Sequence, residues 1–300
     1  MTITKTKKYI AAIAALQILL YHIWIPVFKY GSAIGNLERF LISSTYSGVD
    51  IFFFLSAYTL ANRPVEDYVG FIKNRALKIM PLFLVALAFG KFIWFLPSIM
   101  IMYLVFPPVY RLCKKRPAVS LPLLMIAWGI ITYVILGVLK PSQDYGIFLF
   151  RIPSIILGAY AGALLETKDE KQSVLIPILG AAMLALGTVL VYKYGYINKV
   201  NEPFRGTFYL FGIPTMLGTV LLVDYFAGKI KRINAIEWFG SITLELYFTQ
   251  MVIGTVVIDR MYKLLGNRLA VNVVVLAIII TIAWMINRIC SNMLRHPARS

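Results

Sequence analysis

The chain has 300 residues, of which 60% are hydrophobic and 14% are charged, and its net charge is +17. A soluble domain of this size could not bury so much apolar surface, and the apolar segments are too long and continuous for a β-barrel. The composition therefore predicts an all-α, polytopic integral membrane helix bundle. The basic excess is typical of cytoplasmic loops and lipid headgroup contacts, and no interleaved basic and aromatic surface indicates nucleic acid.

Ten apolar segments are candidate transmembrane helices. They cover residues 9–28, 46–62, 79–91, 92–110, 119–139, 147–165, 174–192, 207–227, 238–258 and 270–290. The third and fourth share one apolar run that breaks near Gly90 and Lys91, which predicts a tight hairpin or a re-entrant pair. The N-terminus resembles a signal peptide, but its apolar run is longer than a signal segment and predicts an uncleaved first span.

The distribution of basic residues predicts the orientation of these spans. With the N-terminus in the cytoplasm, nineteen of the 30 Lys and Arg residues fall in inner segments and ten in outer segments. This bias follows the positive-inside rule and indicates that both termini are cytoplasmic. We expect one domain over residues 1–300, without a fused extracytoplasmic domain, in an inner or plasma membrane. Any chemistry then occurs within the membrane or at its edge.

Three spans place an ionisable residue in the outer half of the membrane: His22, Asp50 and Arg151. At a rise of about 1.5 Å per residue, the three lie at similar depths. Each has an ordinary structural interpretation, as a helix–helix hydrogen bond for His22, an N-cap for Asp50 and a snorkelling side chain for Arg151. Their shared depth instead favours a site in which Asp50 orients His22 as a base and Arg151 stabilises an anion.

Other polar residues suggest structural roles. Glu245 lies deep in the ninth span and needs a partner that the sequence does not identify. Asp224, at the inner end of the eighth span, is interpreted as a solvated cap. Gln17 is interpreted as a helix–helix hydrogen bond.

The inner segment before the third span carries Lys73, Arg75 and Lys78. These residues suit topology or anionic lipid binding, and they equally suit binding of a phosphate-bearing donor. The sequence has neither a Walker phosphate loop nor a dinucleotide glycine motif. No Cys/His cluster indicates a metal site, and none is expected.

Several motifs resemble those of one family of membrane enzymes. They read AAIAALQILLYH in the first span, SGVDIFFFLSAYTL in the second, FIKNRALKIMPLF in the basic segment, and then WFLPSIMIMYLVFPPV, FRIPSIILGAYAG and GSITLELYFTQ. In character and order these segments resemble the acyltransferase 3 family of integral membrane acyltransferases. The resemblance covers most of the chain, and the second-span motif is its most specific part.

The resemblance implies a ten-helix core that transfers an acyl group, usually acetyl, from cytoplasmic acyl-CoA to a hydroxyl of a surface or exported polysaccharide. The family histidine corresponds to His22, the second-span aspartate to Asp50, and the basic donor-side pair to Arg75 and Lys78. Membrane lipids and polysaccharide-biosynthesis proteins are the implied partners.

The chain departs from the family pattern at three positions. Ala11 stands where the family often has an arginine, eleven residues before the histidine. Lys7 and Lys8 lie near that helix face and could supply the charge from one turn lower. Gln250 replaces the family histidine of the ninth span, and Lys78 replaces an arginine, which removes a bidentate phosphate contact.

The sequence therefore predicts a membrane O-acyltransferase, most simply an O-acetyltransferase that uses acetyl-CoA. His22 is the expected general base, with Asp50 as its orienting partner and Arg151 as the oxyanion ligand. Lys73, Arg75 and Lys78 are expected to bind the CoA phosphates. Direct transfer and an acyl-His22 intermediate both remain open.

Two alternatives also remain open. One is a transporter or flippase of a glycan or lipid-linked sugar, with His22 and Asp50 as a proton relay. The other is a catalytically inactive relative that serves as an assembly partner.

Overall fold

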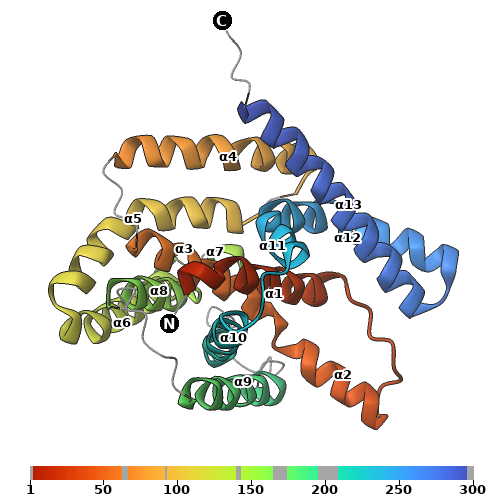
Figure 1. Ribbon diagram of the computed structural model, residues 1–300, viewed down its shortest axis with the longest axis horizontal. Helices are drawn as coiled ribbons and strands as arrows, with labels where there is room; N and C mark the ends of the chain where they lie inside the picture. The colour runs from red at the N-terminus through yellow and green to blue at the C-terminus, as the bar shows by residue number, and fades with distance from the viewer. Residues whose placement is uncertain are drawn as a thin grey trace, which may run out of the picture.

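A computed structural model describes residues 3–62, 67–91, 93–139, 143–164, 174–194 and 209–295, and every element within these ranges is helical (Figure 1). In chain order the elements are α1 (Ile3–Ile23), α2 (Ala33–Ser43), the 3₁₀-helix η1 (Thr45–Ser47), α3 (Gly48–Ala61), α4 (Tyr68–Ala88), α5 (Phe95–Lys115), α6 (Pro117–Val134), the π-helix η2 (Ile135–Leu139), α7 (Gln143–Leu149), α8 (Ile152–Leu164), α9 (Leu175–Tyr194), α10 (Gly212–Ala227), α11 (Asn234–Ser241), α12 (Thr243–Leu265) and α13 (Arg268–Arg295). The predicted all-α class is confirmed.

Among the described residues, seven helical segments are long and apolar enough to cross a membrane. They are Ala33–Ala61, Phe95–Lys115, Pro117–Leu139, Gly146–Leu164, Leu175–Tyr194, Tyr209–Ala227 and Arg268–Ser291. The α11–α12 pair, bent by 58°, makes an eighth if it is one span. Helices α1 and α4 have 21 residues each, or about 32 Å, but carry basic residues. The ten-span topology needs both of them to cross, so it stays a prediction.

Helix α4 differs most from the sequence prediction. It begins at Tyr68, capped by the Asp67 side chain, which accepts a hydrogen bond from the Gly70 backbone N–H at 2.8 Å. Most of the predicted inner loop is therefore helical, and Lys73 and Arg75 project from a helix. The break predicted near Gly90 is present, and Gly90 has a φ of 68° there.

A short helix, α2, was not predicted. It begins after Ser32, whose side chain accepts a hydrogen bond from the Gly35 backbone N–H at 3.1 Å. The segment between α1 and α2 is fixed by Glu38, whose carboxylate accepts hydrogen bonds from the Trp24 indole and the Val27 backbone N–H, both at 2.9 Å. The chain is thus held close to the outer end of α1 immediately after His22.

Helices α3 and α8 approach each other at the backbone level. Gly158 and Gly162 form a G-x-x-x-G pattern on α8, the arrangement that lets membrane helices pack closely. A Cβ atom at Gly158 would lie 2.3 Å from the Phe54 carbonyl oxygen, and one at Gly162 would lie 2.7 Å from the Tyr58 carbonyl oxygen. This contact brings the first turns of α3 and α8 together.

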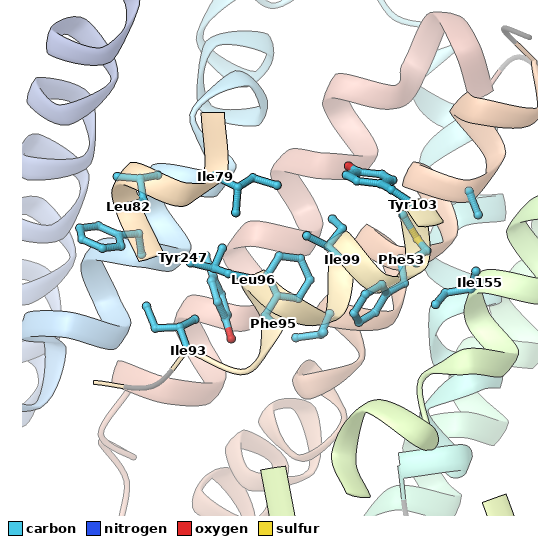
Figure 2. Packing of buried hydrophobic residues seen from close by; sticks show 14 of the residues in the cluster. Phe53, Ile79, Leu82, Ile93, Phe95, Leu96, Ile99, Tyr103, Ile155 and Tyr247 are labelled. Carbon is cyan, nitrogen blue, oxygen red and sulfur yellow. The ribbon is translucent and has the colours of Figure 1, made fainter. Parts of the chain in front are cut away.

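Helix α1 lies at the centre of the bundle and contacts α3, α10, α11 and α12. Figure 1 shows α1, α4 and α5 crossing the view in roughly the same direction, with the starts of α1 and α4 and the end of α5 toward the left. The largest hydrophobic cluster joins α3, α4, α5, α8 and α12 (Figure 2). It separates two groups of polar residues, one at each end of α1 and α3.

Candidate functional site

Asp50 and Arg151 form a buried ion pair between α3 and α8. Asp50 lies in the first turn of α3, and Arg151 immediately precedes α8. The Ser154 hydroxyl, one turn into α8, donates a hydrogen bond of 2.9 Å to the second carboxylate oxygen. Asp50 and Arg151 are 1% and 2% exposed, so each charge depends on the other for compensation.

Aromatic rings enclose the Arg151 guanidinium. Its central carbon lies 4.4 Å from the ring centre of Tyr209 and 5.2 Å from that of Tyr46, distances typical of cation–π contacts. Within the described ranges, the Arg151 Nε atom is buried without a hydrogen-bond partner. The guanidinium is therefore fixed in place and keeps one N–H group for a further acceptor.

His22 lies in the last turn of α1, and its side chain is exposed. Its Nδ1 atom is 3.0 Å from the Ile18 carbonyl oxygen. Because a carbonyl oxygen can only accept, this contact places the proton on Nδ1 and leaves a lone pair on Nε2. The Nε2 atom is therefore able to accept a proton or a hydrogen bond.

Aromatic contacts connect His22 to the tyrosine rings that enclose Arg151. The His22 ring packs edge-on against Tyr21 at 5.1 Å, and Tyr21 packs against Tyr46 at 5.9 Å. The structure thus brings Asp50 and Arg151 into contact and places His22 beside their aromatic enclosure. The expected His22–Asp50 pairing is not what is observed, because Asp50 is bonded to Arg151 and Ser154. The Ile18 carbonyl orients the imidazole instead.

A cavity of about 230 Å³, here called the inner cavity, lies near the start of α1 and the end of α3. Three basic residues line it: Lys7 and Lys8 from α1 and Arg75 from α4. Ala11, which occupies the position of the family arginine, lines the same cavity. The two lysines therefore supply positive charge next to the place where arginine is missing.

Of the predicted donor-binding residues whose side chains are described, Lys73 and Arg75, only Arg75 lines the inner cavity. Its guanidinium lies 5.1 Å from the Phe71 ring and 5.6 Å from the Tyr103 ring. Lys73 is exposed and does not line the cavity. The Lys78 side chain lies outside the part of the structure that is described.

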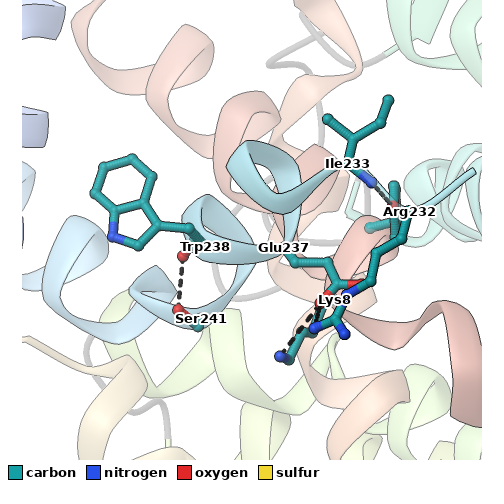
Figure 3. Close-up of polar contacts among 7 residues, drawn as sticks. Lys8, Arg232, Ile233, Glu237, Trp238 and Ser241 are labelled. Carbon is teal, nitrogen blue, oxygen red and sulfur yellow. Dashed lines mark hydrogen bonds and ion pairs between the residues drawn. The ribbon is translucent and has the colours of Figure 1, made fainter.

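A polar network that includes Lys8, one of the residues lining the inner cavity, connects α1 to the segment around α11 (Figure 3). The Glu237 carboxylate lies 3.5 Å from Lys8 Nζ and accepts a hydrogen bond of 2.6 Å from Arg232. That hydrogen bond raises the pKa of Arg232. The Tyr9 hydroxyl accepts a 2.7 Å hydrogen bond from the Ile233 backbone N–H. The start of α1 is thereby tied to the chain that enters α11.

The other polar residues have structural partners. Asn287 donates a 2.9 Å hydrogen bond to Glu245, which supplies the partner that the sequence did not identify. Gln17 donates to Thr219 at 3.3 Å, so the predicted helix–helix hydrogen bond is confirmed. The interpretation of Asp224 as a solvated cap is wrong, because it is fully buried and accepts a 2.7 Å hydrogen bond from Thr6.

Sequence comparison identifies the family. A family model described as an acyltransferase domain matches residues 9–93 and 91–288. The chain belongs to this acyltransferase family. Comparisons with curated proteins and with solved structures give no significant match.

The matched ranges of the acyltransferase include His22, Asp50, Arg151 and Arg75, whereas Lys7 precedes them together with Lys8. The protein is thus a multi-pass membrane acyltransferase with acyl donor and acceptor substrates. Within the described ranges, no group of three or more His, Cys, Asp or Glu residues could hold a metal ion.

Sequence reasoning missed the aromatic enclosure and Ser154. A serine three residues after Arg151 lies on the same helix face, and this spacing was the available signal. Tyr46 and Tyr209 gave no such signal, because they reach Arg151 from two segments far apart in the sequence.

Proposed function

We propose that the acyltransferase moves an acetyl group from cytoplasmic acetyl-CoA to a hydroxyl of a surface or exported polysaccharide, in an inner or plasma membrane. One observation carries the proposal. A basic cavity and a His22–Arg151 group lie at opposite ends of the same helices, α1 and α3. Along α1, Lys8 and His22 are separated by about 21 Å. Transfer across a membrane requires such separate donor and acceptor ends.

The donor end is suited to the phosphates of CoA. Arg75, Lys7 and Lys8 converge on the inner cavity from two helices, and cations of this kind form charge-assisted hydrogen bonds with phosphate oxygens. Lys73 and Lys78, on the same helix as Arg75, add to the positive field in which the donor binds.

The acceptor end is suited to general base catalysis. His22 Nε2 takes the proton of the acceptor hydroxyl as its oxygen bonds to the acyl carbonyl carbon. The carbon–sulfur bond then breaks, and the CoA thiolate leaves and regains a proton from the imidazolium. Arg151 stabilises the oxyanion through its remaining Nε–H group, and Asp50 holds Arg151 in position.

The proposal is tested with the purified protein and His22→Ala in lipid nanodiscs, supplied with radiolabelled acetyl-CoA and a crude cell-surface glycan extract. We expect His22→Ala to lower release of free CoA and transfer of label by roughly a hundred-fold or more, because a general base contributes about that much. Leu16→Ala, a change of an exposed residue on the same helix, should leave both rates unaltered.

Two results would contradict the proposal. If His22→Ala keeps its fold and transfers label at the wild-type rate, the histidine is not the base. If the wild type neither binds nor consumes acetyl-CoA but moves a glycan across proteoliposomes, the protein is a transporter. Activity of the single purified protein would exclude an inactive assembly partner.

A further inference from the structure

The inner cavity continues into an apolar arm of about 180 Å³. The two spaces are continuous because they share lining residues, namely Phe52, Ser56, Arg75, Tyr103 and Thr243. The residues that line only the arm are almost entirely apolar and include Ile79, Phe95, Ile99 and Tyr247. Arg75 therefore lies where the two spaces meet, and the rest of the arm is lined mainly by apolar side chains.

The apolar arm extends toward the level of the ion pair. Along α5 the lining residues of the arm run from Tyr103 to Phe95, which is about 12 Å, and on α3 the arm reaches Phe52, two positions from Asp50. Along α12 they run from Thr243 to Tyr247, and the next turn carries the buried Gln250. The arm therefore points from the basic entrance toward the His22 end of the bundle.

Two aromatic side chains that line the apolar arm, Phe95 and Tyr247, lie close together in the hydrophobic cluster (Figure 2). The ring centres of Phe95 and Tyr247 are 4.9 Å apart, and Phe95 and Phe52 are 6.5 Å apart. Phe95 is 6% exposed and Tyr247 is 5% exposed, so little of either ring can move aside without a rearrangement of the core.

The polarity of this space matches that of an acyl-CoA. The donor carries phosphates at one end, an uncharged arm in the middle and the acyl thioester at the other end. We propose, on the basis of the function proposed above, that the apolar arm receives the acyl end of the donor. Phe95 and Tyr247 then set an upper limit on acyl length. Short acyl groups fit, and longer ones meet the two rings.

The test measures kcat/KM for acetyl-, butyryl- and octanoyl-CoA in nanodiscs. We expect the wild type to use acetyl-CoA best. Phe95→Ala should raise the ratio of octanoyl to acetyl activity by roughly ten-fold or more, because each methylene accommodated in an apolar pocket contributes a factor of about ten or greater. Tyr247→Leu, a smaller reduction in side-chain volume, should change the ratio of octanoyl to acetyl activity in the same direction. This second variant keeps the test informative if Phe95→Ala does not fold.

Phe53→Ala is the matched control. Phe53 is fully buried in the same cluster and contacts Phe95 at 5.2 Å, but it does not line the apolar arm. It should lower the Tm without changing the ratio of acyl donors.

The possible failures can be distinguished. If the wild type uses acetyl-CoA and neither Phe95→Ala nor Tyr247→Leu changes the donor ratio, the inference is wrong and the proposed function stands. An equal change in Phe53→Ala would also overturn it, since a general loosening of the core would then explain the result. If the wild type consumes no acyl-CoA of any length, the proposed function fails and the inference fails with it.

Discussion

The Asp50–Arg151 pair explains how two charges persist in the middle of an apolar bundle. Each has lost nearly all contact with solvent, and each is compensated by the other. Removing one member leaves a buried charge without a counter-charge, which lowers the free energy of unfolding by about 3 to 5 kcal/mol. Replacing both members by apolar residues of similar volume is often tolerated. The pair is therefore expected to behave as a unit in mutational experiments.

Arg151→Met should lower the Tm of the protein in detergent strongly, because Asp50 then remains buried without a counter-charge. The double variant Asp50→Leu/Arg151→Met should recover much of that loss while remaining inactive, because the oxyanion ligand is absent. Thermal unfolding and release of CoA, measured on the same preparations, separate the two effects. A double variant less stable than the single one would show that the pair is not a coupled unit.

The sequence predicts that His22 is a candidate functional residue but does not predict which group orients it. A histidine within an apolar run signals function, because an ionisable group in a membrane span is costly. The orienting partner could not be predicted, since aspartate and arginine at one depth allow more than one pairing. Only the close packing of α3 and α8 assigns Asp50 to Arg151 and leaves the Ile18 carbonyl for the imidazole.

At the scale of elements, the first two turns of α1 supply basic residues to the inner cavity. Lys7→Gln and Lys8→Gln should each raise KM for acetyl-CoA several-fold with little change in kcat, because they remove phosphate contacts remote from the reacting atoms. Arg75→Ala should raise KM more than Lys73→Ala does, since Arg75 lines the cavity.

Lys91→Gln is the matched control for these variants, because it removes the same charge from the segment between α4 and α5. It should leave KM unaltered. A rise in KM for Lys91→Gln equal to that for Lys7→Gln would indicate that net charge, rather than contact in the inner cavity, governs donor binding.

The α3–α8 contact makes a second prediction at this scale. In Gly158→Val the new Cβ would lie 2.3 Å from the Phe54 carbonyl oxygen, a backbone atom that cannot yield without separating the helices. We expect a lower Tm and loss of activity, because Arg151 immediately precedes the same helix. Gly129→Ala, in α6, meets nothing within 4 Å and should be neutral or slightly stabilising.

At the scale of the whole molecule, the ten-span topology depends on whether α1 and α4 cross. Lys91→Cys, in a background without Cys113 and Cys290, should react with an impermeant thiol reagent added outside intact cells. Lys231→Cys, between α10 and α11, should react only after permeabilisation. If Lys91→Cys is protected in intact cells and labelled after permeabilisation, α4 does not cross and the predicted orientation needs revision.

The sequence predicted the class of the fold well, because long apolar runs leave few alternatives. It misplaced the start of α4, since three basic residues within one helix lower its hydropathy below that of an ordinary span. It also could not reveal the inner cavity. The walls of that cavity come from α1, α3, α4, α5, α11 and α12, and no local pattern in any one of them encodes the space between them.

The ion pair has a consequence for biosynthesis. Asp50 and Arg151 are 101 residues apart, so α3 leaves the ribosome long before its counter-charge exists. Asp50 lies within the apolar segment Ala33–Ala61, which is long enough to cross a membrane. Until Arg151 is made, the Asp50 carboxylate must stay hydrated near the headgroups or be sheltered by the insertion machinery. Synthesis of α8 then supplies the counter-charge, so we expect α3 to reach its final depth only after Arg151 has been made.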